Sequence, residues 1–363
     1  MQYRLQFRRY RLPFRAPVRT AHGVWAEREG LIVRLQDASE GGSGAVGWGE
    51  AAPIPEFGTE TVDEVEAGVR GLGEWIEGTK LEAVPPRLGC LRNAIAAAVE
   101  EVGRAFDPPS NASSRKGPVK DRPYLGVAAL LPAGRAALEK ISERAELGFR
   151  VFKWKVGVGD LADEIALLDD VCAALPSGAK LRLDANGAWD RRQAERWLER
   201  CAERPVEFVE QPCFAPPSGA SQGTALFRRT EELLLGLAGD FPTPIALDES
   251  LVGEGDVERW IGAGWPGVFV VKPSLIGDVA SVMARLEKAK ASVVFSSALE
   301  TAVGARAALR VAFAWKGEPA RALGFGVWPL FAEARCDGPF AAPFLRAEDV
   351  ERLNPEAVWN ALS

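Results

Sequence analysis

Residues that form disulfides or bind soft metals are scarce in this chain of 363 residues. The cysteines are odd in number, scattered and without a Cys-x-x-Cys pair: Cys90, Cys172, Cys201, Cys213 and Cys336. This pattern argues against a disulfide framework and favours thiols acting as small core residues in a reducing compartment. The single histidine, His22, lies far from the other polar motifs described below, which argues against a Ser-His-Asp triad.

Long apolar runs are also missing. The start of the chain has no apolar signal core and no stretch is long enough to span a bilayer, so we expect a cytoplasmic protein with no membrane partner. The formal net charge of −6 argues against a nucleic-acid partner. There is no Walker loop, and the glycines at 157 and 159 are better explained by a short turn than by a dinucleotide fingerprint. A small molecule is the expected partner, and no pattern specifies an oligomeric state.

The first part of the chain, residues 1–110, has the pattern of a small α+β domain. Strand-like alternation occurs at 2–10, at 30–36 and near 46–50, and helical patterns follow at 60–78 and 89–105. Residues 107–122 are rich in polar residues, glycine and proline and form the best linker candidate. We expect this part to act as a capping domain.

From residue 123 to 330 the pattern changes to alternating strands and helices. Eight short apolar runs are expected to be strands, at 124–131, 151–156, 180–183, 206–209, 245–247, 268–271, 293–295 and 323–327. Asp190 and Asp278 are expected N-caps of two of the intervening helices. A doubly wound open sheet is the alternative, but it leaves two edges, so the rhythm favours a (β/α) barrel. The segment 331–363 is too short for a domain and is expected to return to the capping domain.

Acidic residues stand where three consecutive strands end. Asp184, Glu210 and Asp248 each follow an apolar stretch, and the carboxyl ends of barrel strands meet at one mouth. Carboxylates gathered there repel one another unless a cation lies among them. Oxygen ligands without cysteine or histidine predict Mg²⁺, or Mn²⁺, rather than zinc. Glu249 is expected to support these ligands, and the alternative for the acids is a set of separate helix caps.

Lysines inside apolar strands are the second anomaly. Lys153 and Lys155 share one face of a strand, and Lys272 ends another strand on the other side of the barrel. They either pair structurally with the acids or include a catalytic base. A lysine can remove a proton next to a carboxylate if a divalent cation neutralises the developing negative charge.

These motifs resemble the signature of the enolase superfamily, muconate-cycloisomerase subgroup. The matching segments are Lys153-x-Lys155, Asp184-Ala185-Asn186, Glu210-Gln211-Pro212, Asp248-Glu249-Ser250 and Lys272. The resemblance implies an enolase-type barrel with an N-terminal capping domain, Mg²⁺ on Asp184, Glu210 and Asp248, and Lys155 as the base with Lys272 opposite. It also implies supporting roles for Lys153, Arg182, Asn186 and Glu249.

Within the subgroup, the segments 181–189, 19–23, 296–300 and 324–326 are most similar to the o-succinylbenzoate synthase family. That resemblance implies a lyase that dehydrates 2-succinyl-6-hydroxy-2,4-cyclohexadiene-1-carboxylate to 2-succinylbenzoate in menaquinone or phylloquinone biosynthesis. Arg19, His22, Ser296 and Ser297 are candidates for binding the distal carboxylate of the substrate. Two alternatives stay open. One is an N-succinylamino acid racemase, alone or as a second activity, and the other is a non-catalytic metal-binding barrel.

Overall fold

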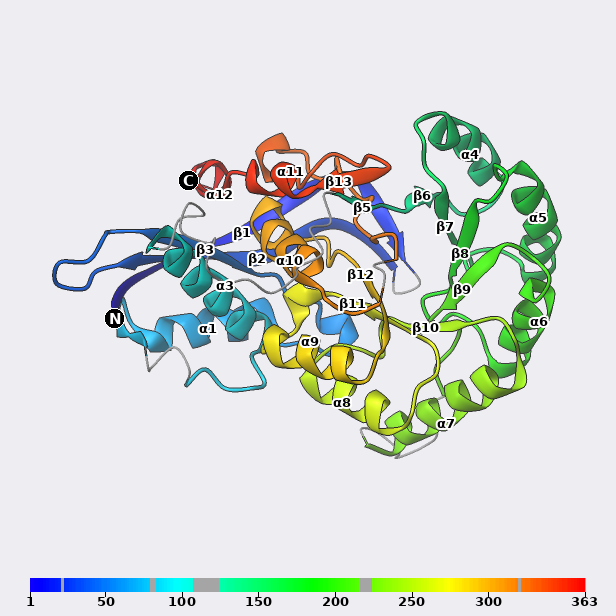
Figure 1. Ribbon diagram of the computed structural model, residues 1–363, viewed down its shortest axis with the longest axis horizontal. Helices are drawn as coiled ribbons and strands as arrows, with labels where there is room; N and C mark the ends of the chain where they lie inside the picture. Colours follow the sequence, from blue (N-terminus) through cyan, green and yellow to red (C-terminus); the bar gives the residue numbers. More distant parts are fainter. Residues whose placement is uncertain (21–22, 79–82, 107–123, 216–223, 319–320, 363) are drawn as a thin grey trace.

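The computed structural model describes residues 1–20, 23–78, 83–106, 124–215, 224–318 and 321–362. An antiparallel sheet with its helices forms one side of the molecule, and a ring of helices around parallel strands forms the other (Figure 1). The predicted linker at 107–122 and His22 lie outside the described residues. The described helices include none long and apolar enough to cross a membrane, and a cytoplasmic location stays a prediction.

The N-terminal sheet has the strand order β3-β2-β1-β4. Its strands are β1 (Gln2–Thr20), β2 (Gly23–Asp37), β3 (Val46–Ala51) and β4 (Trp75–Glu77). The hairpin of β1 and β2 is longer than the sequence predicted, with a register shift between Pro13 and Val18. The interpretation of Arg19 as a loop residue was therefore wrong, because cross-strand pairing continues beyond the shift and sets its backbone opposite Val24.

Among the described residues, helices α1 (Val62–Leu72) and α3 (Gly89–Phe106) cover this sheet. Helix α1 begins at a capping box made by Thr61 and Glu64. It is shorter than predicted, because Gly73 has a φ of 81° and the chain then returns as β4. Helix α3 packs so closely on β3 that a Cβ at Gly47 or Gly49 would overlap its backbone carbonyls.

The second part of the chain is a curved, seven-stranded parallel sheet surrounded by helices. Its strands, in spatial and chain order, are β6 (Ala129–Leu131), β7 (Val151–Lys155), β8 (Lys180–Asp184), β9 (Val206–Glu210), β10 (Ile245–Leu247), β11 (Val268–Val271) and β12 (Ser292–Phe295). The helices are α4 (Ala136–Glu146), α5 (Leu161–Ala174), α6 (Arg191–Cys201), α7 (Thr224–Asp240), α8 (Glu254–Gly262), α9 (Val279–Lys288) and α10 (Ala302–Ala314), with the 3₁₀ turn η3 (Pro273–Leu275) after β11. Asp190 and Asp278 cap α6 and α9, as predicted.

The eighth predicted strand, at 323–327, is not a regular strand. Single bridges join Leu323 to Val127 and Gly324 to Ser296, so this segment still links the two ends of the curved sheet. A Cβ at Gly324 would overlap the Ser296 side chain, which explains why so close an approach uses glycine. The predicted strand at 124–131 is split into β5 (Tyr124–Gly126) and β6, because β5 pairs with β13 (Phe344–Arg346) instead.

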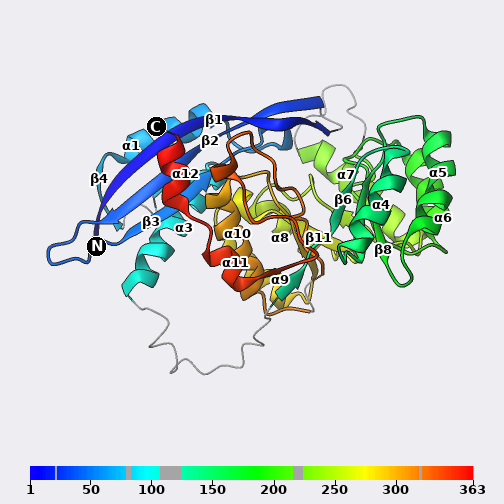
Figure 2. The ribbon, with the colours of Figure 1, turned by 90° about the horizontal axis from the view of Figure 1, so that it is seen from above.

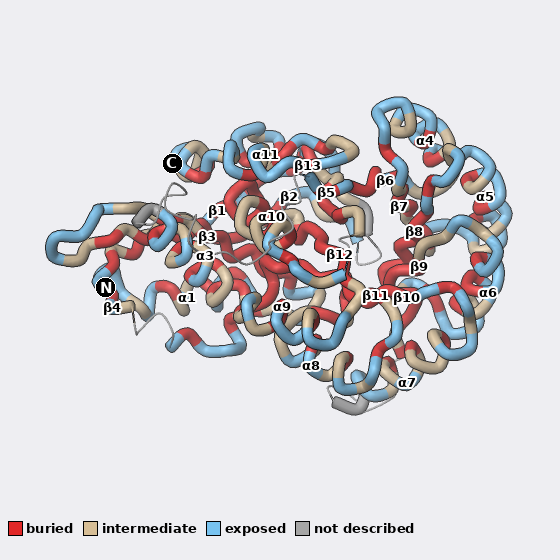
Figure 3. The backbone as a smooth tube through the Cα atoms, in the orientation of Figure 1, coloured by how far each residue is buried: buried red, intermediate tan, exposed pale blue. Residues whose placement is uncertain are grey.

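Apolar packing inside and outside the sheet holds the strand ends in place. The barrel interior contains Phe208, Ala246, Val268, Val270 and Val294, and a larger cluster fills the space between sheet and helices. In Figure 3 the buried residues lie along the strands, and the exposed residues lie on the outer sides of the helices.

The C-terminal segment contains η4 (Ala334–Cys336), β13, α11 (Ala347–Glu351) and α12 (Pro355–Ala361). The Arg8 guanidinium of β1 lies 4.3 Å above the ring of Trp359 in α12, and the Trp48 ring is 5.4 Å from the same ring. Figure 2 shows α12 beside β1. These contacts join the end of the chain to the N-terminal sheet.

Candidate active site

A cavity of about 210 Å³ lies at the carboxyl ends of the barrel strands. Its polar lining includes eight of the predicted site residues: Lys153, Lys155, Asp184, Asn186, Asp248, Lys272, Ser296 and Ser297. Its apolar lining comes from both parts of the chain: Val18, Trp25, Ile54, Phe57, Leu130, Leu131, Ala298, Leu299 and Val327. The N-terminal domain therefore closes one side of the barrel mouth.

The three predicted metal ligands end neighbouring strands, as expected. Asp184 is the last residue of β8, Glu210 the last of β9, and Asp248 follows β10, and all three are buried. Lys153 Nζ lies 3.0 Å from Asp184 Oδ2 and 2.6 Å from Glu210 Oε1. The Lys272 ammonium group donates to the Asp248 carboxylate. The three carboxylates and two of the lysines thus form one group of ion pairs.

Turns after the strands hold these side chains at the mouth. Gln211 has a φ of 35°, and its side-chain oxygen accepts hydrogen bonds from the backbone N–H groups of Asp248 and Ser250, both at 3.2 Å. Gln211 therefore fixes the turn that carries Asp248, a role that we did not predict although its position after Glu210 was the available signal. Asn186 donates to Glu249 at 2.7 Å, which links the β8 and β10 turns.

Burial and neighbouring charges shift the pKa values in opposite directions. Burial, followed by repulsion from Asp184, raises the pKa of Glu249 to about 7. Burial lowers the pKa of Lys272 to about 8. Burial also acts to lower the pKa of Lys153, but attraction to Asp184 and Glu210 outweighs it, so that pKa lies above its usual value. The barrel mouth therefore concentrates negative charge that the lysines only partly offset.

The donor set suits a hard divalent cation. It comprises three carboxylates, and two further buried oxygens nearby, Asn186 Oδ1 and Glu249 Oε2, lack a hydrogen-bond partner. In the conformation described, however, no three acidic, histidine or cysteine side chains among the described residues form a ready metal-binding group. The ammonium groups of Lys153 and Lys272 lie against the carboxylates instead. A cation bound by these carboxylates therefore competes with both ammonium groups.

The lysines differ in their surroundings. Lys155 lines the cavity and, in the part of the chain that the structure describes, makes no ion pair, unlike Lys153 and Lys272. Lys272 follows β11 and its Nζ lies 5.3 Å from the centre of the Phe57 ring, under the N-terminal domain. Two amines from separate strands thus reach the same cavity.

Arg182, Ser296 and Ser297 use their polar groups in hydrogen bonds to the protein itself. Arg182 is buried inside the barrel, where it pairs with Glu207 at 2.7 Å and donates to the carbonyl of Ala322 at 2.7 Å. These contacts make it a support of the barrel interior. Ser296 Oγ donates to the Gly324 carbonyl at 3.3 Å, and Ser297 Oγ to Glu300 at 3.0 Å. Both serines reach the cavity, but their hydroxyl hydrogens serve the protein's own structure.

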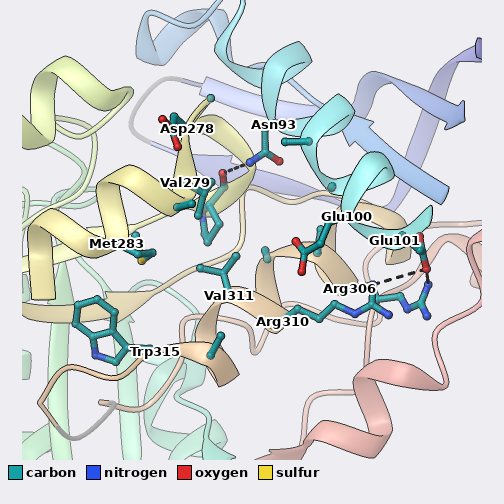
Figure 4. A pocket seen from close by; sticks show the side chains of 18 of the residues that line it. Asn93, Glu100, Glu101, Asp278, Val279, Met283, Arg306, Arg310, Val311 and Trp315 are labelled. Atoms are coloured by element: carbon teal, nitrogen blue, oxygen red, sulfur yellow. Dashed lines mark hydrogen bonds and ion pairs between the residues drawn. The ribbon is translucent and has the colours of Figure 1, made fainter. Parts of the chain in front are cut away.

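A larger cavity, about 490 Å³, lies outside the barrel between α3, α9 and α10 (Figure 4). It contains none of the predicted catalytic or metal-binding residues. Polar side chains of its lining already have partners within the protein: Arg306 pairs with Glu101, and Asn93 donates to the carbonyls of Pro273 and Ile276. The three predicted lysines and two of the three predicted metal ligands line the smaller cavity, so we place the active site there.

Comparison with known proteins decides the family. Residues 136–344 match the enolase C-terminal domain-like family, and residues 2–90 match the N-terminal domain of the MenC family. The chain belongs to the enolase superfamily. The predicted resemblance and the barrel fold are therefore confirmed.

Relatives within the superfamily are similar over nearly the whole chain. An o-succinylbenzoate synthase from Thermosynechococcus vestitus is 40% identical over 329 residues, covering 89% of this chain and 92% of that protein. The crystal structure of o-succinylbenzoate synthase from Thermosynechococcus elongatus BP-1, with Mg in its active site, has a TM-score of 0.77 at 37% identity and covers 99% of both chains. Muconate lactonizing enzyme from Pseudomonas fluorescens has a TM-score of 0.71 at 22% identity, covering 90% of this chain and 88% of that one, and shares the fold.

Proposed function

We propose that this protein is an o-succinylbenzoate synthase, a hydro-lyase of menaquinone or phylloquinone biosynthesis. The observation that carries the proposal is the joint arrangement of Asp184, Glu210 and Asp248 at one mouth with Lys155 and Lys272 lining the same cavity. The similarity to o-succinylbenzoate synthases over most of the chain supports this reaction among those that such a site could perform.

The substrate is a small-molecule carboxylate, 2-succinyl-6-hydroxy-2,4-cyclohexadiene-1-carboxylate. The reaction removes the proton from the carbon that bears the ring carboxylate and breaks the bond between the neighbouring carbon and its hydroxyl group. The two carbons become joined by a double bond, so the ring is aromatic, and the hydroxyl leaves as water. The product is stable, and the barrier lies in the negative charge that develops on the carboxylate when the proton is removed.

Lys155 is the base in this proposal. Lys155 lines the cavity and makes no ion pair within the described residues. Its amine can therefore take the proton and then deliver it to the departing hydroxyl. Lys272 approaches from a different strand and stabilises the anionic intermediate as an ammonium ion. Lys153, held by Asp184 and Glu210, keeps these carboxylates in place.

Asp184, Glu210 and Asp248 would hold Mg²⁺, with Mn²⁺ as a possible substitute, because hard cations prefer carboxylate oxygens. When bound, the cation supplies positive charge to the substrate carboxylate, where negative charge accumulates. Asn186 and Glu249 support the ligands through their mutual hydrogen bond.

The apolar walls suit the ring of the substrate. Trp25, Ile54 and Phe57 approach from the N-terminal domain and Leu130 and Leu299 from the barrel, so a flat carbon ring can be buried between them. Arg19, His22, Ser296 and Ser297 remain proposed contacts for the succinyl carboxylate.

The experiment is a spectroscopic assay of purified protein with Mg²⁺ and the cyclohexadiene substrate, which gains aromatic absorbance on conversion. The same preparation is assayed for racemisation of N-succinylamino acids. Rapid, metal-dependent formation of 2-succinylbenzoate is the expected result. Racemisation without dehydration, or neither activity, would contradict the proposal.

A further inference from the structure

Two loops that line the active-site cavity are joined by buried polar side chains of the N-terminal domain. The first, called the capping loop, comprises residues 52–57 and contributes Ile54 and Phe57 to the cavity. The second, called the barrel loop, comprises residues 296–301 and contributes Ser296, Ser297, Ala298 and Leu299. From these contacts we infer that Arg28 and Glu50 are positioning residues that set the shape of the substrate cavity, an inference that rests on the proposed function.

Glu50, the penultimate residue of β3, holds the far end of the barrel loop. Its carboxylate accepts hydrogen bonds from the backbone N–H of Thr301, at 2.9 and 3.1 Å, and from that of Gly304 at 2.9 Å. The Thr301 hydroxyl also donates to it. A carboxylate at the start of α10 is favoured by the helix dipole and by the first N–H groups, which have no partner within the helix. Glu50 therefore binds the barrel although it belongs to the N-terminal sheet.

Tyr10 of β1 fixes the orientation of this carboxylate. Its hydroxyl donates to Glu50 Oε1 at 2.5 Å, and both side chains are buried. With donors on several sides and only 2% of its surface exposed, Glu50 has little freedom to adopt another rotamer. Movement of this side chain would leave buried N–H groups of α10 without partners, which is costly.

Arg28 of β2 connects the two loops directly. Its guanidinium donates to the carbonyls of Ala52 and of Pro53, the latter at 2.7 Å, in the capping loop. It also donates to the carbonyl of Ala298 in the barrel loop at 3.2 Å. The buried, planar guanidinium of Arg28 therefore fixes the distance between the two loops that line the cavity. A lysine cannot replace it fully, because its ammonium group lacks the fixed, forked arrangement of donors.

The barrel loop needs this support because its conformation is strained. Leu299 has a φ of 60°, a left-handed conformation that non-glycine residues adopt at a cost. Within the loop, Ser297 Oγ accepts from the Leu299 N–H at 2.9 Å while Glu300 accepts from the Ser297 hydroxyl and from the Ala298 N–H. Arg28 and Glu50 hold the carbonyl of Ala298 and the N–H of Thr301, on either side of this strained residue.

The test compares Glu50→Gln with Glu101→Gln in the full-length protein. Glu101 of α3 likewise contacts α10 from the N-terminal part of the chain, through a part-buried ion pair with Arg306, but it contacts neither loop (Figure 4). Glu50→Gln replaces one acceptor oxygen by an NH₂ group, so one oxygen remains for donors that the two carboxylate oxygens of Glu50 share. Two readouts are made: hydrogen exchange of the backbone amides at 296–304, and KM and kcat for the cyclohexadiene substrate with saturating Mg²⁺.

We expect Glu50→Gln to accelerate exchange at 296–304 and to raise KM by about tenfold, with a smaller effect on kcat and an unchanged affinity for Mg²⁺. Glu101→Gln should leave the exchange of this segment and KM unchanged. Arg28→Lys should resemble Glu50→Gln. Tyr10→Phe removes one hydrogen bond to Glu50 and should give the same changes to a smaller degree. This variant tests the inference even if Glu50→Gln does not fold.

The outcomes separate this inference from the proposed function. Unchanged exchange at 296–304 in Glu50→Gln and Tyr10→Phe, or faster exchange with an unchanged KM, would overturn the positioning role. Equal effects of Glu50→Gln and Glu101→Gln would show a general stabilising role and would overturn it as well. A wild-type protein that does not dehydrate the substrate refutes the proposed function, whereas the exchange result still decides whether Glu50 holds the loop.

Discussion

Lys153 of β7 donates to Glu210 of β9 over 2.6 Å, across the end of the intervening strand β8. The same ammonium group contacts Asp184, so it lies between two of the three proposed metal ligands. A divalent cation that binds these carboxylates must compete with it. Lys153 therefore stabilises the fold and limits metal affinity at the same time.

Lys153→Met should lower the free energy of unfolding by about 3 kcal/mol without metal, because two buried carboxylates lose their partner. Added Mg²⁺ should recover much more stability in this variant than in the wild type, since the cation then no longer competes with Lys153 for Asp184 and Glu210. Urea unfolding with and without Mg²⁺ measures both effects. Lys140→Met, which removes an exposed ion pair with Glu143, is the control and should change little. Equal responses of both variants to Mg²⁺ would contradict the competition.

Removal of a ligand charge should weaken metal binding. Asp184→Asn, Glu210→Gln and Asp248→Asn should each raise the dissociation constant for Mg²⁺ at least about tenfold in calorimetric titrations. Asp278→Asn is the control. It removes a carboxylate from the same barrel, but asparagine can still cap α9, so the Mg²⁺ affinity of this variant should equal that of the wild type. If all three ligand variants bound Mg²⁺ as tightly as the wild type, these carboxylates would not be its ligands.

Glu300 should make stability depend on pH. Burial, followed by repulsion from Glu50, raises its pKa to about 7 from 4.5. Tyr10 and Lys272 also face it, and Ser297 and the N–H of Ala298 donate to it. The folded state holds a proton that the unfolded state has lost between these two pH values. The contribution of Glu300 to stability therefore falls as the pH rises from about 4.5 to about 7 and is constant above.

Glu300→Gln removes this titration without changing the size of the side chain. The variant should gain stability relative to the wild type as the pH rises, by up to about 3 kcal/mol at pH 8, which is the free energy equivalent of the pKa shift. Urea unfolding of both proteins at several pH values between roughly 5 and 8 measures the difference. A difference that is constant over this range would show that Glu300 does not titrate there.

The sequence was sufficient to predict the barrel and the positions of its polar strand ends. Apolar runs that end in an acid or a lysine are local patterns, and they located Asp184, Glu210, Asp248 and Lys272 at the ends of their strands. The caps Asp190 and Asp278 were predictable for the same reason, because the signal lies within four residues of the helix start.

Features that depend on distant parts of the chain were not predictable. Glu50 and Thr301 are 251 residues apart, and nothing in either segment specifies the partner. The eighth run was read as a strand from its apolar character, but whether it forms a ladder or single bridges depends on the closeness of Ser296 and Val127. Gln211 follows a predicted ligand, yet its hydrogen bonds to the β10 turn follow from its positive φ. Tertiary contacts decided each of these.

In the proposed mechanism, Lys155 removes the proton that starts the dehydration. The most direct measurement is the rate of 2-succinylbenzoate formation by purified Lys155→Ala and wild-type protein with Mg²⁺, with circular dichroism and Mg²⁺ titration as checks on fold and metal site. We predict a loss of at least about 100-fold in kcat, because a positioned base contributes that much or more, with fold and metal affinity retained. A variant that folds, binds Mg²⁺ and turns over at a rate close to that of the wild type would contradict the account.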